Sequence, residues 1–342
     1  MFCNAAILFE HNKPLVIDKI KLPRLNTGQV LIKLMVSGIC QSQLLEINGF
    51  KDNKKFLPHC LGHEGSGIVI DTGPKVTMVK KGDRVSLTWI KGKGLDGGAT
   101  FFECNNNKIN AGPITTFSEY TIVSENRVYP LKTNISFEDA ALLGCAVPTG
   151  LGAILNLLKP QENQSLAIFG CGAIGLIALQ GAKICGCNPI IAIDLYDNKL
   201  QFAKEMGAKY IINAKEFSLE KINTLVKDLD FAVEASGSHI AMINALKAVR
   251  PQGGKAVIIG NIHYQGEISI NPREFNLGKS LLGTWGGNSV PFRDYYKYEK
   301  LIRERKLDLS FFKNDIYTLE NINSAIESFS KGKIARPLIK FY

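Results

Sequence analysis

Three short segments each carry a side chain of a type that binds zinc in proteins. They are SGICQSQ with Cys40, LGHEGSG with His63 and Glu64, and LLGCAVPTG with Cys145. Two thiolates and one imidazole would leave the fourth tetrahedral position open, as a catalytic zinc requires. Taken singly, each residue has a plainer explanation, since a lone cysteine is more often an inert buried thiol. Separations of 23 and 82 residues form no local motif, so the residues alone leave both explanations open.

A glycine-rich turn predicts a second site of a different kind. Gly170, Gly172 and Gly175 directly follow the strand-like SLAIF and open the helix-like AIGLIALQGAKI, whose first residues are Ala173 and Ile174. Such a turn brings the backbone close to a pyrophosphate and places an anion on a helix N-terminus. The alternative is a turn that only packs helix against strand. The strand, the helix and all three glycines in register favour a dinucleotide site.

An acidic residue ends the next predicted strand. Asp194 lies 19 residues past Gly175. A carboxylate there can accept both hydroxyls of the adenosine ribose and repels a 2′-phosphate. Leu195 and Tyr196, which follow, offer no arginine to hold such a phosphate. We therefore predict NAD rather than NADP, with Lys199 on the following helix also in the cofactor site.

The pattern of apolar residues differs between the first and the second part of the chain. Up to about residue 146, short apolar runs broken by Gly, Asn, Asp and Pro predict a small β-rich domain, built as a partly open barrel. From about residue 147, near-continuous apolar strands alternate with amphipathic helices, which predicts a doubly wound parallel sheet covered on both faces. After residue 285, helix-like segments lead to a last strand, RPLIKFY. The expected fold is α/β, with a catalytic domain over 1–146, a nucleotide-binding domain over 147–284 and a return to the catalytic domain over 285–342.

Composition narrows the class of protein. The 342 residues contain no apolar stretch long enough to span a bilayer, and the N-terminal segment lacks the features of a secretory signal, so we expect a cytoplasmic protein without a membrane partner. The eight cysteines have neither the density nor the spacing of a disulfide scaffold. The formal net charge of +10 is spread along the chain without a nucleic-acid-binding motif. Attraction of an anionic cofactor or substrate explains it better than nucleic acid does.

Several segments together resemble one family. SGIC-x-S, GHEGSGIV, GDRV, TFSEYTIV, GC-x-x-x-TG and the glycine turn occur in the order and at about the intervals typical of the zinc-containing medium-chain alcohol dehydrogenases, and the resemblance covers essentially the whole chain. It implies a GroES-like β-rich catalytic domain and a Rossmann domain. It also implies that Cys40, His63 and Cys145 bind zinc, with Glu64 behind or transiently on the metal.

The resemblance also assigns residues around the reacting atoms. It implies that Ser42 takes the substrate proton, that Thr149 lies beside the nicotinamide and that Arg336 contacts the pyrophosphate. Trp89 and Trp285 match positions that line the substrate pocket. Zinc would act as a Lewis acid on the alcohol or carbonyl oxygen while hydride moves to or from the nicotinamide. A plainer explanation of Ser42 is a serine that caps a helix.

The chain departs from the family pattern in two regions. Many relatives bind a second, structural zinc through four closely spaced cysteines, but the corresponding stretch here carries Cys104 alone, so we expect one zinc per chain. Gln41 and Gln43 flank Ser42 where relatives often carry a basic or histidine residue and an acidic one, and Leu45 stands where some carry a relay histidine. The route of the proton beyond Ser42 is therefore not predicted.

The function expected from the sequence is a zinc-dependent, NAD-linked alcohol dehydrogenase acting on a polar alcohol, polyol or sugar derivative. Lys91 and Lys93, near Trp89, could attract an anionic group or could be ordinary solvated lysines. Two alternatives stay open: a zinc-free quinone or enone reductase of the same fold, and a crystallin-like dinucleotide-binding protein without turnover. Relatives commonly pair, so a homodimer or homotetramer is expected.

Overall fold

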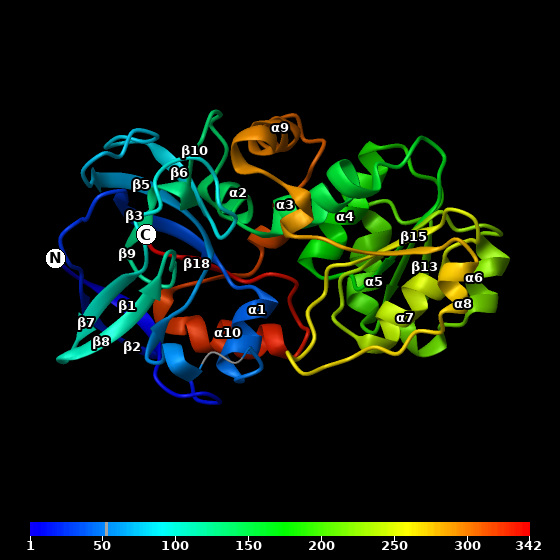
Figure 1. Ribbon diagram of the computed structural model, residues 1–342, viewed down its shortest axis with the longest axis horizontal. Coiled ribbons are helices and arrows are strands. Elements are labelled where there is room, and N and C mark those ends of the chain that lie inside the picture. Colours follow the sequence, from blue (N-terminus) through cyan, green and yellow to red (C-terminus); the bar gives the residue numbers. More distant parts are fainter. Residues whose placement is uncertain (52–53) are drawn as a thin grey trace. The chain divides into compact units, whose positions relative to one another are not determined.

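The computed structural model describes residues 1–51 and 54–342. Within them the chain forms two compact units (Figure 1). The first unit joins two separate stretches, Met1–Cys145 and Val290–Tyr342, and the second is the continuous stretch Ala146–Ser289. Within the described residues, no helix is both long enough and apolar enough to cross a membrane.

The first unit is mainly β-structure with short helices. Its strands are β1 (Phe2–Leu8), β2 (Val16–Lys21), β3 (Gln29–Gly38), β4 (His59–Cys60), β5 (Glu64–Thr72), β6 (Arg84–Thr88), β7 (Thr100–Cys104), β8 (Asn107–Gly112), β9 (Tyr120–Ser124), β10 (Val128–Pro130), β17 (Ile316–Tyr317) and β18 (Leu338–Lys340). Its helices are α1 (Gln41–Ile47), η1 (Lys54–Phe56), η2 (Glu125–Arg127), α2 (Phe137–Leu142), α9 (Pro291–Arg303), η6 (Ser310–Lys313), η7 (Leu319–Asn321) and α10 (Ile322–Ser330).

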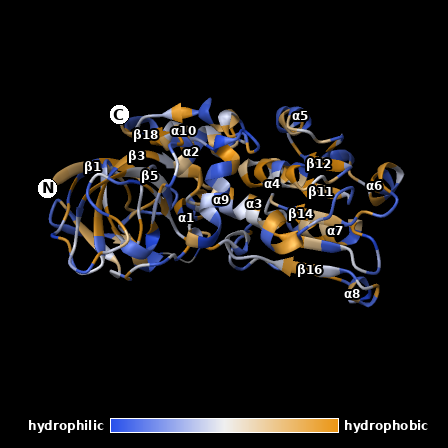
Figure 2. Cartoon of the chain, turned by 90° about the horizontal axis from the view of Figure 1, so that it is seen from above, coloured by the Kyte–Doolittle hydropathy of each residue, from blue (hydrophilic) through white to orange (hydrophobic). Residues whose placement is uncertain are grey.

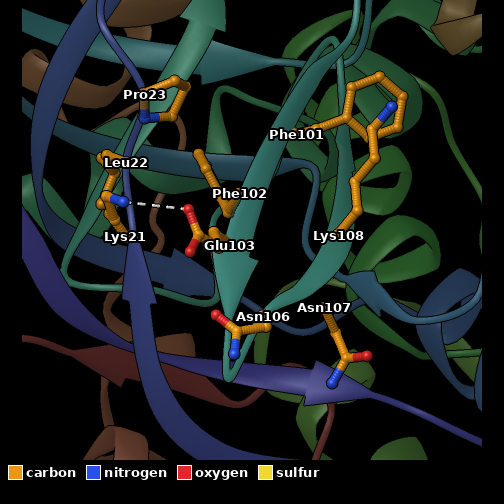
Figure 3. A pocket seen from close by; sticks show the side chains of 9 residues that line it. All are labelled: Lys21, Leu22, Pro23, Phe101, Phe102, Glu103, Asn106, Asn107 and Lys108. Carbon is orange, nitrogen blue, oxygen red and sulfur yellow. Dashed lines mark hydrogen bonds and ion pairs between the residues drawn. The ribbon is translucent and has the colours of Figure 1, made fainter.

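One part of this unit is a closed barrel in the order β1-β2-β7-β8-β4. The prediction of a partly open barrel is therefore wrong: the hairpin β7–β8 pairs with β2 on one side and with β4 on the other, and β4 pairs with β1. Strand β7 of this hairpin ends at Cys104, whose side chain packs in the barrel core. Figure 3 shows contacts that hold the hairpin: Glu103 pairs with Lys21 at 3.1 Å, and the ammonium of Lys108 lies 3.8 Å from the centre of the Phe101 ring.

The second sheet of this unit joins residues from both ends of the chain. Its order is β10-β6-β5-β3-β18-β17, and β9 also pairs with β3. Strand β18 pairs antiparallel with β3, with Leu338 opposite Gly38. Helices α1 and α10, blue and red in Figure 1, share one hydrophobic cluster that includes Ile47, Ile322 and Ile339. Burial of these apolar side chains ties the returning segment to the N-terminal stretch.

The second unit is a doubly wound α/β domain. Its strands are β11 (Leu166–Phe169), β12 (Ile190–Asp194), β13 (Tyr210–Asn213), β14 (Phe231–Glu234), β15 (Lys255–Ile258) and β16 (Ser280–Gly283). Its helices are α3 (Ala146–Gly152), η3 (Ala153–Leu158), α4 (Ala173–Ile184), α5 (Asp197–Glu205), η4 (Ala214–Glu216), α6 (Leu219–Leu225), α7 (His239–Ala248), α8 (Arg273–Asn276) and η5 (Gly286–Asn288).

All six strands of this sheet run parallel in the order β13-β12-β11-β14-β15-β16. This is the predicted Rossmann arrangement, in which the strand order reverses between β11 and β14. The strands are short and apolar because both faces are covered; Figure 2 colours β11 and β12 largely as hydrophobic. In such sheets ligands bind outside the carboxyl ends of the strands, at the reversal point.

Candidate metal and cofactor sites

The first unit brings three ligand-type side chains together. Cys40 is the residue before α1, His63 the residue before β5, and Cys145 follows α2. Their ligand atoms all lie within 4.8 Å of one another, although the residues come from three separate segments. Both thiols are buried and the imidazole is half-buried, with His63 Nε2 at 3.3 Å from Cys145 Sγ. Two thiols and one imidazole nitrogen facing a common point are a donor set that suits zinc.

The pKa values of the two thiols are shifted in opposite directions. The pKa of Cys40 is lowered well below its usual value, chiefly because the Cys145 thiol donates to it, with the buried Arg336 guanidinium contributing. The same donation, together with burial, raises the pKa of Cys145. A divalent cation beside both sulfurs would favour the thiolate form of each, which is the form that binds metal. The residues therefore fit a zinc ion.

A glutamine and a serine contact the far side of the imidazole. Gln43 Nε2 lies 2.6 Å from His63 Nδ1, and Ser42 Oγ lies 3.3 Å from the same nitrogen. Gln43 Oε1 accepts a hydrogen bond from the backbone N–H of Cys40 at 2.9 Å. Sequence analysis noted Gln43 only as a departure from the family and missed these contacts, because sequence does not give the direction of a side chain.

Glu64 and Arg336 form a buried ion pair rather than standing apart in two sites. Arg336 Nε donates to Glu64 Oε1 at 2.7 Å, and the two side chains are 3% and 0% exposed. Glu64 starts β5, and Arg336 lies just before β18, so the returning segment supplies the cation. Glu64 is not among the three clustered ligand-type residues. The predicted contact of Arg336 with a pyrophosphate stays a prediction.

A chain of hydroxyl groups, which sequence analysis missed, supports the segment that carries Cys145. Thr88 Oγ1 donates to the carbonyl oxygen of Gly144 at 2.8 Å. Since its only proton is used there, Thr88 accepts the hydrogen bond that the Tyr295 hydroxyl donates at 2.9 Å. All three residues are buried in the first unit, and Tyr295 comes from α9. Helix α9 therefore helps to fix the residue next to a candidate ligand.

The two tryptophans predicted for the substrate pocket lie in different units. The ring of Trp89 is 6.5 Å from that of His63, in an edge-on arrangement at 73°. Trp285 belongs to the second unit and is 74% exposed. Of the two lysines near Trp89, Lys91 is exposed and pairs with Asp96 at 2.9 Å. Trp89 thus lies beside the candidate metal ligands, and the charge of Lys91 is compensated.

The glycine turn of the second unit has a backbone conformation and a close packing that require glycine at two of its positions. Gly170 has φ +97, a left-handed conformation that favours glycine. A Cβ on Gly175 would lie 1.8 Å from the carbonyl oxygen of Gly170, so only glycine allows α4 to approach β11 this closely. Gly172 precedes α4, whose first residues are Ala173 and Ile174, and a Cβ on it would meet no atom within 4 Å. The turn therefore leaves open space at a helix N-terminus.

Asp194 ends β12 beside this turn. Its Oδ2 accepts from the backbone N–H of Cys171 at 2.7 Å, and Oδ1 accepts from that of Tyr196 at 2.9 Å. Lys199 lies on α5 with its ammonium 4.8 Å from the centre of the Tyr196 ring. Thr149 lies in α3, and its buried Oγ1 has no hydrogen-bond partner within the described residues. The side chain of Asp194 thus links the glycine turn to the end of β12 by a hydrogen bond.

A second carboxylate at the same edge of the sheet was missed by sequence analysis. Glu234 ends β14 and is fully buried; its Oε1 accepts from Ser236 N at 2.7 Å, Ser236 Oγ at 2.5 Å and Gly237 N at 2.9 Å. Burial raises the pKa of this carboxyl group. A Cβ on Gly170 would lie 2.6 Å from Ser236 N, so this turn packs against the glycine turn. An acidic residue at the end of an apolar strand was the available signal.

Comparison with known proteins agrees with this geometry. Residues 26–133 match the alcohol dehydrogenase GroES-like domain and residues 173–304 match the zinc-binding dehydrogenase domain. Alcohol dehydrogenase 1 of Pisum sativum is 30% identical, with 99% of this chain and 97% of that protein covered. The S-(hydroxymethyl)glutathione dehydrogenase of Synechocystis sp. is 32% identical over the full length of both chains.

A solved structure of an alcohol dehydrogenase is also similar to this chain over its whole length. The benzyl alcohol dehydrogenase of Acinetobacter calcoaceticus has a TM-score of 0.88 and 27% identity, with 99% of each chain covered. A GroES-like domain with a Cys-His-Cys cluster and a Rossmann domain with a glycine turn define a two-domain dehydrogenase. The chain belongs to the zinc-containing medium-chain alcohol dehydrogenase family.

Proposed function

We propose that the chain is a zinc-dependent, NAD-linked alcohol dehydrogenase that transfers hydride reversibly between NAD and an alcohol or carbonyl substrate. The observation that carries the proposal is the convergence of Cys40, His63 and Cys145, whose ligand atoms lie within 4.8 Å. The lowered pKa of Cys40 also supports it, because the thiolate is the form of cysteine that binds a metal ion.

The chain's own residues have distinct roles in this proposal. The zinc, when bound, supplies Lewis-acid stabilisation of negative charge on the substrate oxygen. Ser42 Oγ, close to the His63 ring, would accept the hydroxyl proton of an alcohol while passing its own hydroxyl proton onward, and would act in the opposite sense in the reverse direction. The buried Arg336 guanidinium compensates the Glu64 carboxylate, so that pair adds little net charge beside the sulfurs.

The cofactor is proposed to be NAD bound at the glycine turn. Gly170, Gly172 and Gly175 give the pyrophosphate a close approach to the backbone at the start of α4. Asp194, at the end of β12, faces the adenosine ribose and disfavours a 2′-phosphate. The Oγ1 of Thr149, which has no hydrogen-bond partner among residues 1–51 and 54–342, supports a contact with the nicotinamide end.

The substrate is proposed to be a polar alcohol, such as a polyol, a sugar derivative or a phosphorylated alcohol. The net charge of +10 favours an anionic or polar substrate, and one relative is named for a hydroxymethyl derivative of glutathione. Lys91 is paired with Asp96, which leaves the exposed Lys93 as the lysine available for this role.

Metal content combined with NAD reduction tests the proposal. The purified chain should contain one zinc per chain and reduce NAD with an alcohol drawn from a panel of primary alcohols, polyols and phosphorylated sugars. A chelator should abolish activity without unfolding the chain, because a catalytic zinc on a large preformed core contributes little to folding. Cys40→Ser should lose both zinc and activity. The matched control Cys3→Ser changes a buried thiol of the barrel and should keep both.

The other outcomes identify the alternatives. Full activity without any metal would favour the zinc-free quinone or enone reductase. Bound NAD with no turnover across the whole panel would favour a crystallin-like protein. Two zinc ions per chain would contradict the single-site proposal. Sedimentation of the same preparation tests the proposed homodimer or homotetramer.

A further inference from the structure

One amide connects two of the candidate metal ligands. Gln43 is 1% exposed and lies in the first turn of α1. Its Oε1 accepts from the Cys40 backbone N–H at 2.9 Å, while its Nε2 lies 2.6 Å from His63 Nδ1 and 3.3 Å from Ser42 Oγ. The acceptor end of the amide therefore serves the backbone of one ligand, and the donor end faces the ring of another.

This orientation fixes where the imidazole carries its proton. An amide nitrogen donates, so Nδ1 of His63 must accept, and the neutral ring then carries its proton on Nε2. Nε2 is also the nitrogen that lies 3.3 Å from Cys145 Sγ, on the side of the thiols. A ring in this tautomer has no free electron pair on Nε2 to offer a metal.

Metal binding requires the opposite tautomer. A histidine that binds through Nε2 donates its Nδ1–H to an acceptor, which is often a carboxylate. Gln43 can accept this proton only by turning its amide over. The NH2 group of the amide then faces the Cys40 N–H, and this buried N–H loses its hydrogen-bond acceptor. The cost of an unsatisfied buried N–H disfavours the metal-bound arrangement. A carboxylate of the same length has two acceptor oxygens and serves Cys40 and His63 at once.

We propose that Gln43 is a positioning residue that stabilises the metal-free tautomer of His63, so that the site releases zinc more readily than it would with a carboxylate at this position. The inference rests on the proposed function, because it assumes that Cys40, His63 and Cys145 bind zinc. Residues that contact a metal-binding histidine change metal affinity by about 10- to 100-fold when they are replaced.

The test compares zinc release from the full-length, zinc-loaded wild type and from Gln43→Glu. Transfer of zinc to a chromophoric chelator should be at least about tenfold slower in Gln43→Glu. Gln41→Glu is the matched control, since it adds the same charge two residues away on the exposed face of α1. It should release zinc at the wild-type rate. Equal or faster release from Gln43→Glu, or equal slowing in both variants, would overturn the inference.

A second measurement uses the wild type alone, so it does not depend on whether a variant folds. In the metal-free wild type, long-range proton–nitrogen NMR correlations of labelled histidine should show the His63 proton on Nε2, and zinc should move it to Nδ1. A proton on Nδ1 in the metal-free protein would overturn the inference. If the wild type binds no zinc at all, the proposed function itself fails; if one zinc is bound but release is unaffected by Gln43→Glu, only the role of Gln43 fails.

Discussion

Both carboxylate oxygens of Asp194 accept hydrogen bonds from backbone N–H groups nearby. One oxygen accepts from Cys171, within the glycine turn, and the other from Tyr196. Each carboxylate oxygen has a further lone pair, so a ribose hydroxyl can be accepted without breaking these bonds. The residue is therefore expected to shape the turn and to contact the cofactor.

We predict that Asp194→Ser raises the KM for NAD by about tenfold or more, since it loses a charge-assisted hydrogen bond. The KM for NADP should fall relative to that for NAD, because the repulsion of a 2′-phosphate is removed. Steady-state kinetics with both cofactors measures this. Asp197→Ser, an exposed aspartate on α5, is the control and should leave both constants unchanged. A wild type that already preferred NADP would contradict the role of Asp194.

Glu234 gives a prediction about pH. Burial raises its pKa above the usual value of 4.5, and the hydrogen bonds from Ser236 and Gly237 only partly oppose this. A folded-state pKa above the unfolded one means that the contribution to stability is full below the unfolded pKa and is lost as pH rises through the folded value. Glu234→Gln removes this titration.

The free energy of unfolding of Glu234→Gln, relative to wild type, should therefore increase between pH 4.5 and pH 8. Urea unfolding at several pH values measures the difference. Glu205→Gln, exposed on α5, should show a constant difference over this range. A difference that falls with rising pH would show that the folded pKa of Glu234 is not raised.

At the scale of elements, α9 holds the segment that carries Cys145 through Tyr295, Thr88 and Gly144. Tyr295→Phe removes one buried hydrogen bond and should destabilise the first unit by about 1 kcal/mol. The chain has two tryptophans, one in each unit, so in a Trp285→Phe background the fluorescence of Trp89 reports the first unit alone. Tyr296→Phe, exposed on the same helix, should unfold at the wild-type urea concentration. An equal effect of both substitutions would contradict the role of the Tyr295 hydroxyl.

The helices and strands differ in how well the sequence predicts them. The strands of the second unit were predictable because each is a short apolar run next to an amphipathic helix, and parallel sheets of this kind follow one rule of strand order. The closure of the barrel was not predictable. It depends on the pairing of β7 with β2 and of β8 with β4, and no local sequence pattern specifies which distant segments pair. The position of the glycine turn was predictable because its backbone conformation and its close packing of helix against strand both require glycine.

The candidate metal site was predictable only in part. Cys40, His63 and Cys145 are separated by 23 and 82 residues, and only resemblance to a family grouped them in advance. Their partners were missed for a common physical reason. The contacts of Gln43, Thr88 and Tyr295 depend on side-chain directions and on packing between elements far apart in the chain.

For the whole molecule, the net charge of +10 predicts a salt dependence. Excess positive charge speeds the approach of anionic ligands, and dissolved ions screen it. The kcat/KM of a phosphorylated alcohol should fall several-fold between about 20 and about 200 mM salt, whereas that of an uncharged alcohol should change little. Lys93→Ala should reduce this dependence more than Lys91→Ala, because Lys91 is already paired with Asp96. Equal salt dependence for both substrates would contradict electrostatic attraction of the substrate.

The division of the first unit into two stretches also sets an order of events on the ribosome. Glu64 and Arg336 are 272 residues apart, which at about 5 to 20 residues per second corresponds to about 14 to 54 s of translation. During that time the whole of Ala146–Ser289 is synthesised as one continuous stretch, while the earlier segment still lacks its last strand and the cation that pairs with Glu64. All residues of the doubly wound unit are therefore available before those of the first unit, and the surroundings of the three zinc-ligand candidates can become complete only after residue 336 has been added.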